Sequence, residues 1–589
     1  MSAAARAGLV AAVVVIAAGS SFEARRLAGD LKTPRDLHGV AFVGSDACAR
    51  CHEDNHRSWH RTFHRTMTAE ATAASVLGAF DGATLRHDGV TARMDRDAAG
   101  AFRMTFTRDG GAARAVVIAR TVGSHRYQQY LAKEGDTYWR LPVAWHVEEK
   151  RWFPMTGAFL FSDDAAIEVP GRPVFGGGVF DRHVTRWNDN CVFCHNVGPN
   201  PGLDARTGRF ATTTAELGIA CEGCHGPGGA HVSANADPLR RSWLRARHAP
   251  DPTIVNPARL TPARAADLCG RCHGQRLADD VGPFLAHGDP FVPGDDLALT
   301  TAPLWRDTPL GGDREAFAAR FWDDGTPRLT AYEYQGLLQS RCAQQGALTC
   351  TTCHGMHEGD PRGQLRAGLR GADADRMCTS CHAALAEPRA AARHTHHDAA
   401  GAGARCVSCH MPRVVYGVLD VHRSHRIEIP EPARAAASGR PDACTGCHVT
   451  ETPAWAAAAR ARSWGREPSP ANAAPSPRDA LFAGDPITRA VSADALGRAQ
   501  VPLAPAERAS RVGALVEAMT GDAYPAVRHL AWRALERLGV AARDYDPSAD
   551  VATRAAVVAR IRMGLAADAV APGPRLPARG HGEDIEIGE

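Results

Sequence analysis

The sequence predicts a loop-rich chain of two or three domains, with a small β-rich insert and a C-terminal region of helical repeats. Its 589 residues exceed the size of a usual single core. Aromatic residues make up only 6 %, whereas glycine and proline are frequent, at 57 and 38 residues. This composition indicates that something besides side-chain packing contributes to the interior. The net charge of +3 gives no electrostatic support for a nucleic-acid partner.

The N-terminal segment 1–21 is predicted to be a signal peptide or an N-terminal anchor. A single positive charge at Arg6 precedes an apolar run from Ala7 to Gly19. That length fits the apolar region of a secretory signal, about 7–15 residues, better than the about 20 residues of a spanning helix. We therefore expect an exported protein whose membrane contact is limited to this segment.

The β-rich insert is expected over residues 75–165. FRMTFTR and AARAVVIAR flank Asp109-Gly110-Gly111, which is the pattern of a hairpin with a glycine-rich turn. TYWRLPVAWHVEEKRWF continues with the alternation typical of strands. The expected role of the insert is structural, although it could also shape a docking surface.

The C-terminal region 475–570 is predicted to form HEAT-like helical repeats. An offset of 39 residues places Arg489 on Arg528 and Leu496 on Leu535, close to the HEAT period of about 40. Such a module favours a protein partner, and a helical lid over the core is the alternative. Residues 571–589 are expected to be a polar tail.

The cysteines fall into one repeated pattern, Cys-x-x-Cys-His, which occurs eight times and uses all cysteines but Cys342. The cysteines of the motifs are Cys48, Cys51, Cys191, Cys194, Cys221, Cys224, Cys269, Cys272, Cys350, Cys353, Cys378, Cys381, Cys406, Cys409, Cys444 and Cys447. The histidines that follow them are His52, His195, His225, His273, His354, His382, His410 and His448.

This pattern is the attachment signal of c-type haem. Two thiols on one short turn reach the two vinyl groups of a porphyrin, and the adjacent imidazole becomes the proximal ligand of the iron. Structural zinc and disulfides are the alternatives, but neither requires a histidine after every second cysteine. The sequence therefore predicts eight covalently bound haem c groups in a core over residues 40–465.

Covalent haem attachment in bacteria takes place outside the cytoplasm, which agrees with export to the periplasm or another extracytoplasmic location. Lysine occurs only at Lys32, Lys133 and Lys150 among 68 basic residues, so arginine dominates. Planar guanidinium groups suit the haem propionates as ion-pair partners. A bias in base composition is the alternative explanation of this excess.

A second axial ligand is needed for each low-spin haem, and 19 of the 27 histidines lie outside the motifs. Histidine is far more abundant than methionine, so bis-histidine ligation is expected for most haems. His231 and His357 follow their motifs too closely to reach the same iron and should serve a neighbour. A solvated or propionate-bonding histidine is the alternative at each position. The candidate second ligands are His64, His125, His231, His357, His397 and His425.

Several segments resemble multihaem cytochromes of the cytochrome c554 type, a group related to hydroxylamine oxidoreductase and the multihaem nitrite reductases. These segments are CHEDNHRSWHRTFH, TVGSHRYQQY, GIACEGCHGPGGAHV, RCVSCHMP and HRSHRIEIP. The resemblance covers roughly residues 40–465 and implies a mostly helical, loop-rich core with closely stacked haems. It thus implies a mainly α fold class for the whole chain. By the same resemblance, five histidines match distal-ligand or haem-packing positions: His64, His125, His231, His397 and His425.

Electron transfer is the favoured function, with redox proteins such as a quinol-linked donor or a terminal reductase as partners. The alternative is an oxidoreductase that acts on a small nitrogen or sulfur oxyanion at one open haem. The nitrite reductases of this class carry a Cys-x-x-Cys-Lys motif, which is absent here. Hydroxylamine oxidoreductase needs a late cross-linking tyrosine, and the late tyrosines are only Tyr416, Tyr524 and Tyr545. No catalytic residue is therefore assigned.

Overall fold

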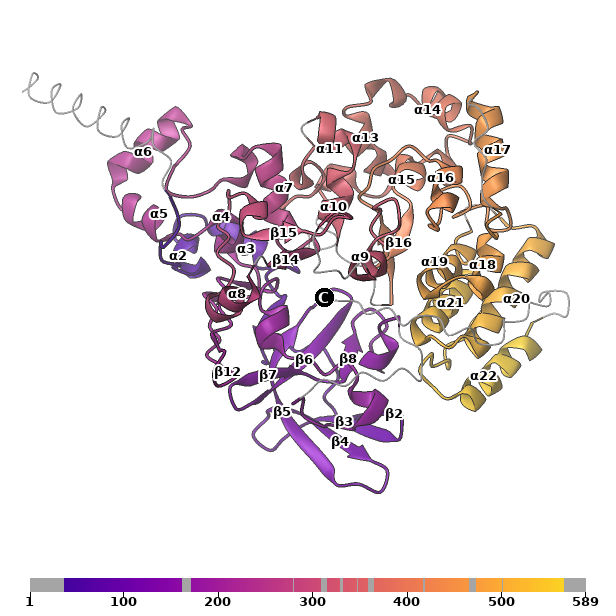
Figure 1. Ribbon diagram of the computed structural model, residues 1–589, viewed down its shortest axis with the longest axis horizontal. Helices are drawn as coiled ribbons and strands as arrows, with labels where there is room; N and C mark the ends of the chain where they lie inside the picture. The colour runs from indigo at the N-terminus through magenta and orange to yellow at the C-terminus, as the bar shows by residue number, and fades with distance from the viewer. Residues whose placement is uncertain are drawn as a thin grey trace, which may run out of the picture.

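The computed structural model describes residues 36–160, 171–278, 280–308, 315–328, 332–346, 348–358, 365–416, 419–465, 473–499 and 502–565. The expected signal segment and polar tail lie outside these ranges. No helix within them is long and apolar enough to cross a membrane. Figure 1 shows an antiparallel sheet, a region of short helices that carries the Cys-x-x-Cys-His motifs, and a C-terminal helical bundle.

The sheet has nine strands, all paired antiparallel, with a path β2-β3-β4-β5-β6-β8-β9, while β1 pairs with β5 and β7 with β6. β2 lies near β9, so the sheet is nearly closed. The strands are β1 Thr68–Glu70, β2 Ala83–His87, β3 Val90–Arg96, β4 Phe102–Arg108, β5 Ala113–Val122, β6 Tyr127–Glu134, β7 Thr137–Arg140, β8 Val143–His146 and β9 Arg151–Pro154.

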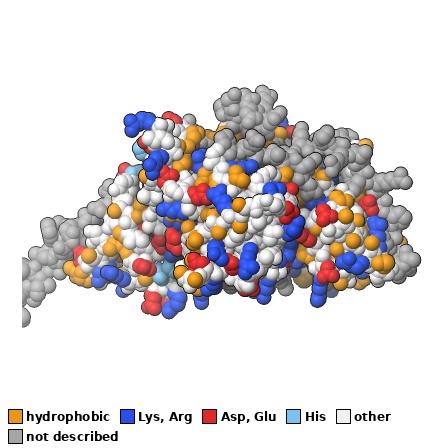
Figure 2. All heavy atoms as spheres, turned by 90° about the horizontal axis from the view of Figure 1, so that it is seen from below, with side chains coloured by type: hydrophobic (Ala, Val, Ile, Leu, Met, Phe, Trp, Pro, Cys, Tyr) orange, Lys and Arg blue, Asp and Glu red, His pale blue; other side chains and the backbone are white. Residues whose placement is uncertain are grey.

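Alternating side chains explain why these segments form a sheet with one buried face. In β4, Phe102, Met104 and Phe106 are buried, and the residues between them are half-buried. The hairpin expected at the glycine-rich turn is confirmed, because β4 pairs with β5 from Arg103 opposite Val117 to Thr107 opposite Ala113. The face seen from below in Figure 2 carries acidic and basic side chains interspersed.

The motif region consists of short helices and two-stranded ribbons. Its helices are α2 Ser45–Ala49, α3 Glu53–Trp59, α4 Cys221–His225, α5 Gly229–Ala234, α6 Pro238–Arg247, α7 Pro262–Gly270, α8 Val281–His287, α9 Glu315–Arg320, α10 Glu333–Leu338, α11 Arg341–Gln345, α12 Cys350–Cys353, α13 Arg376–Thr379, α14 Pro388–Thr395, α15 Cys406–His410, α16 Pro432–Ala437 and α17 Pro453–Trp464. Its strands are β10 Asn196–Val197, β11 Leu203–Asp204, β12 Arg209–Phe210, β13 Glu216–Leu217, β14 Arg276–Ala278, β15 Thr301–Pro303, β16 Arg413–Val415 and β17 Val421–Arg423.

The C-terminal bundle comprises α18 Pro477–Ala483, α19 Pro486–Leu496, α20 Pro505–Gly521, α21 Pro525–Arg537 and α22 Val551–Met563. Four of these helices begin with proline, whose fixed φ and missing N–H suit the first helical position. The two arginines aligned by the 39-residue offset meet the same loop. Arg489 pairs with the carboxylate of Asp522 at 3.1 Å, and Arg528 donates to its backbone oxygen at 2.6 Å.

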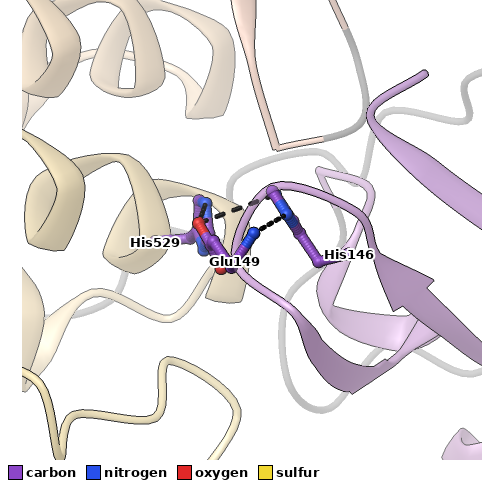
Figure 3. A group of neighbouring side chains, drawn as sticks. All are labelled: His146, Glu149 and His529. Carbon is purple, nitrogen blue, oxygen red and sulfur yellow. Dashed lines mark hydrogen bonds and ion pairs between the residues drawn. The ribbon is translucent and has the colours of Figure 1, made fainter. Parts of the chain in front are cut away.

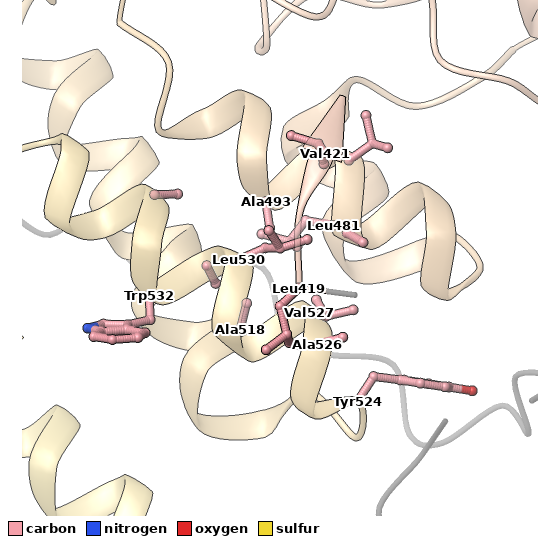
Figure 4. Close-up of a cluster of buried hydrophobic side chains, with 14 of the residues drawn as sticks. Leu419, Val421, Leu481, Ala493, Ala518, Tyr524, Ala526, Val527, Leu530 and Trp532 are labelled. Atoms are coloured by element: carbon pink, nitrogen blue, oxygen red, sulfur yellow. The ribbon is translucent and has the colours of Figure 1, made fainter. Parts of the chain in front are cut away.

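One hydrophobic core joins the bundle to the rest of the chain. Figure 4 shows Leu419 and Val421 of the motif region packed with Leu481, Val527 and other bundle residues. The same core includes residues of the sheet domain, such as Phe153 and Met155. The helices therefore bury their apolar faces against both other parts of the molecule.

The expectation of a mainly α fold is wrong. The chain is 40 % helical with 16 % strand, and the strands include the large antiparallel sheet. The cause is that the insert forms a complete sheet with its own apolar core, which includes Val90, Phe106, Tyr130 and Trp152. The motif helices, by contrast, are short because each spans little more than one attachment turn.

Candidate haem-binding site

Each motif folds as a single helical turn that places its two cysteines on one side. The backbone N–H of the motif histidine bonds to the carbonyl of the first cysteine, the i to i−4 pattern of a helix. Bonds of this kind, of 2.9 to 3.2 Å, are found at His52, His195, His273, His354, His382 and His448, and α4 and α15 hold the remaining two motifs. No disulfide joins any of the 17 cysteines, all of which lie in the described ranges.

Six motif histidines face a second histidine ring at nearly constant spacing, with 6.0 to 6.3 Å between ring centroids. Two metal–nitrogen bonds of about 2 Å, plus about 1 Å from each ring nitrogen to its ring centre, put two axial imidazoles about 6 Å apart. Each pair thus leaves room for one iron. The pairs, with the motif residue first, are His52–His231, His225–His357, His273–His64, His354–His425, His410–His394 and His448–His397.

The ring nitrogen away from the gap is held by an acceptor at several of these histidines. Nδ1 of His225 donates to the backbone carbonyl of Val255 at 2.8 Å. In the same way, Nδ1 of His410 donates to the carbonyl of Glu428, and Nδ1 of His397 to that of Thr395, both at 2.7 Å. A proton on Nδ1 leaves the Nε2 lone pair for a metal, which is the usual outer-shell arrangement of metal-binding histidine.

Partly buried carboxylates lie beside two of these histidines, His231 and His273. Asp251 accepts from Nδ1 of His231 at 3.2 Å, and Glu333 lies 3.4 Å from Nδ1 of both His273 and His422. Carboxylate partners raise the basicity of a ligating imidazole.

Five of the six predicted second ligands face a motif histidine, namely His64, His231, His357, His397 and His425. His125 instead stacks on Phe63 at 4.0 Å, and burial lowers its pKa. His394 was missed by sequence reasoning. The signal for it was weak, because it is one of three histidines within HTHH and only the backbone turn at His396 separates them.

Thiols of different motifs lie close together and show which attachment sites are neighbours. The thiols of four pairs lie close enough for each to be the main cause that shifts its partner's pKa: Cys48 with Cys221, Cys194 with Cys272, Cys269 with Cys350, and Cys378 with Cys406. Electrostatic interaction also links Cys224 with Cys272, Cys353 with Cys381, and Cys409 with Cys447. The eight attachment sites therefore form one connected series.

The residues that line a pocket beside the last motif indicate whether haem propionates would fit there. Cys447 lines it together with Arg413, Arg423 and Arg498. Burial and the charges of Arg498 and Arg423 lower the pKa of Arg413 to about 10. Three arginines against the two carboxylates of the lining, Asp442 and Asp494, leave the pocket with a net positive charge. A propionate would offset that charge, so the residues present suit the group.

A different cluster, of His146, Glu149 and His529, has the spacing of metal ligands, with its ligand atoms within 4.8 Å of one another (Figure 3). It joins the β8–β9 turn to α21. Nδ1 of His146 accepts from the Glu149 N–H at 3.2 Å, and Nδ1 of His529 accepts from Arg151 at 3.2 Å. Both imidazoles must then carry their proton on Nε2, which faces Oε1 of Glu149 at 3.6 and 3.3 Å.

A proton on Nε2 occupies the nitrogen of each histidine that would have to bind a metal beside Glu149, and the guanidinium of Arg533 lies 3.4 Å from the same carboxylate oxygen. We therefore interpret the cluster as a buried hydrogen-bonded contact between the sheet and the bundle. Burial lowers the pKa of His146 to about 4 and that of His529 well below its ordinary value. Both histidines are thus neutral at neutral pH.

Comparisons with known proteins bear on the motifs. No curated protein matches the chain. Among solved structures, the chain is similar to one titled "Crystal Structure of Outer Cell Wall Cytochrome OcwA", with 18 % identity, 88 % of this chain and 99 % of that chain covered, and a TM-score of 0.44. A family model described as a doubled CXXCH motif matches residues 343–387, which hold two of the eight motifs. The motifs thus support a multihaem c-type cytochrome with covalently bound haem c.

Proposed function

We propose that the protein is an exported octahaem c-type cytochrome that carries electrons along mostly bis-histidine haems. The observation that carries this proposal is the set of six histidine pairs, each with room for one iron between its rings. In every pair one ring belongs to an attachment motif and the other comes from a different stretch of the chain. Haem iron with two histidine ligands supplies reversible one-electron chemistry.

The contacts between thiols support an order for electron flow. Numbered along the sequence, motif 1 adjoins motif 3, which adjoins motif 4, and the series continues through motifs 5, 6 and 7 to motif 8. Motif 2 joins the series at motif 4 through Cys194 and Cys272. Electrons would therefore run between motif 1 and motif 8, with a branch at motif 2.

Redox proteins are the proposed partners, with a quinol-linked donor or a terminal reductase at the two ends. The HEAT-like region could bind a further protein. An extracytoplasmic location is part of the proposal, since covalent haem attachment in bacteria occurs outside the cytoplasm.

The mass of the intact, matured chain tests the cofactor content, and we expect a gain of eight haems. Electron paramagnetic resonance of the oxidised protein tests the ligation, and we expect low-spin signals. His64→Ala should convert one haem, the one attached at Cys269 and Cys272, to high spin, while the exposed control His287→Ala should convert none. A stoichiometric high-spin signal in the wild type that shifts with nitrite, hydroxylamine or sulfite would contradict this function and favour an oxyanion oxidoreductase.

A further inference from the structure

We propose that α6 is the docking surface for an acidic redox protein that exchanges electrons at motif 1. The surface also includes Val232 of α5 and the nearby Val43. This inference rests on the proposed electron-transfer function and adds the place of contact and the charge of the partner. α6 and α5 lie at one end of the molecule, far from the C-terminal bundle (Figure 1).

The charge of α6 is strongly positive. Its sequence PLRRSWLRAR contains four arginines and no acidic residue. Arg240 is buried and paired with Asp251 at 2.7 Å. Arg241 donates to backbone carbonyls, Arg247 lies over the ring of Trp243, and Arg245 is exposed. Within the described part of the chain, none of these three forms an ion pair, so their charge is available to a partner.

The same helix is tied to the motif 1 ligands. Asp251 joins Arg240 of α6 to Nδ1 of His231, which faces His52 across the space for an iron. Cys51 and His52 are themselves exposed. A partner on α6 would therefore sit beside motif 1.

Motif 1 is also the more open end of the series. Cys51 of motif 1 is exposed, whereas Cys444 and Cys447 of motif 8 are both partly buried. At the other end, Cys447 lines a pocket together with Val491 of α19 and with Arg498, which follows that helix. Direct access for a carrier protein is therefore better at motif 1.

Exposed apolar side chains lie on the same helix as the arginines, on the neighbouring α5 and at residue 43. Val43, Val232 and Leu239 are 37 %, 43 % and 60 % exposed. Val43 lies against the start of α5, because a Cβ placed on Gly228 would be 3.0 Å from its side chain. An apolar centre with a charged rim is the usual make-up of a small, transient interface. Basic residues beside it would steer an acidic partner and raise its association rate.

Stopped-flow reduction of the haem-loaded full chain tests the proposal. The electron donor is reduced plant-type ferredoxin, an acidic carrier with a potential of about −400 mV, and each productive encounter passes one electron from its cluster to the protein. We expect a second-order rate constant that falls steeply with salt. Arg245→Glu combined with Arg247→Glu should lower that constant about tenfold or more at low salt. The control pair Arg560→Glu and Arg562→Glu on α22, with the same spacing, should change it less than twofold.

Equal rates for the α6 variant and its control would overturn the proposal. It would also be overturned if a basic c-type cytochrome reacted faster than ferredoxin, or if the α6 variant lost only binding to vesicles of anionic lipid. Haem content and reduction by dithionite distinguish failure of the underlying function. Loss of either in the wild type contradicts the electron-carrier proposal, whereas the docking result concerns α6 alone.

Discussion

Replacement of His146 by asparagine tests the interpretation of the buried contact between sheet and bundle. Asparagine can still accept the Glu149 N–H, but it does not titrate between pH 7 and 4. Burial, followed by the charges of Arg151 and Arg533, lowers the pKa of His146 from 6.5 to about 4. Glu148 and Asp420 act in the opposite sense. The folded state therefore disfavours the protonated imidazole.

The size and sign of the effect follow from linkage. A drop in pKa from 6.5 to about 4 corresponds, at about 1.4 kcal/mol per pH unit, to about 3 kcal/mol of stability. This contribution is fully present above pH 6.5 and is lost as the pH falls towards 4. About 2 kcal/mol should be gone by pH 5. Glu149, whose pKa burial raises, contributes in the opposite direction, and the substitution leaves that carboxyl in place.

Hydrogen exchange of peptides from β8, β9 and α21 measures the opening of this contact. In the wild type, the opening free energy, corrected for intrinsic exchange, should fall between pH 7 and pH 5. His146→Asn should remove about 2 kcal/mol of that dependence and leave the part that His529 supplies. His287→Asn, at an exposed position, serves as the control. An unchanged pH dependence in His146→Asn would refute the reasoning, and a zinc-dependent gain in protection would favour the metal site over the hydrogen-bonded contact.

Three further changes have distinct expected outcomes. His231→Ala should give one high-spin haem at motif 1, whereas conversion at Cys221 and Cys224, detected by assigned resonance spectra, would contradict the pairing with His52. Glu333→Gln should raise the midpoint potential of one haem in a redox titration, because the carboxylate makes His273 a stronger donor to the iron. The shift should be about 60 mV for each tenfold change in the relative affinity of the ligand for oxidised and reduced iron. Lowered or unshifted potentials would disprove that role. Leu535→Ala, at a fully buried position, should lower the free energy of unfolding by about 2–5 kcal/mol in denaturant titrations. A change under about 1 kcal/mol would mean that the bundle core relaxes to fill the cavity.

The candidate attachment residues stand out in the sequence because covalent haem attachment requires a fixed spacing within five residues. Local geometry also indicated that His231 must serve a haem other than its own. The identity of its partner, His52, depends on packing between distant segments, which no local pattern encodes. His394 illustrates the same limit, since the left-handed backbone at His396 (φ 54°) sends His394 towards His410 and His397 towards His448.

The sheet was predictable strand by strand but not in extent. Alternation reveals which residues of β3 and β4 face inward, and the glycine turn after β4 marks a hairpin. β1 pairs with β5 and β6 pairs with β8, so some neighbouring strands of the sheet are not consecutive in the sequence. Such pairings depend on the whole domain, so the sequence indicated a small insert where the structure has a nine-stranded sheet.

Cross-pairing of histidines has a consequence for how the protein matures. Every second ring that faces a motif comes from outside that motif, and for motifs 1, 3 and 5 it lies further along the chain. A haem attached early would remain five-coordinate and reactive towards small molecules until the later segment had been synthesised and folded. Closing such long loops is slow. Assembly of this protein would then need protection of the first haems until the last histidines arrive.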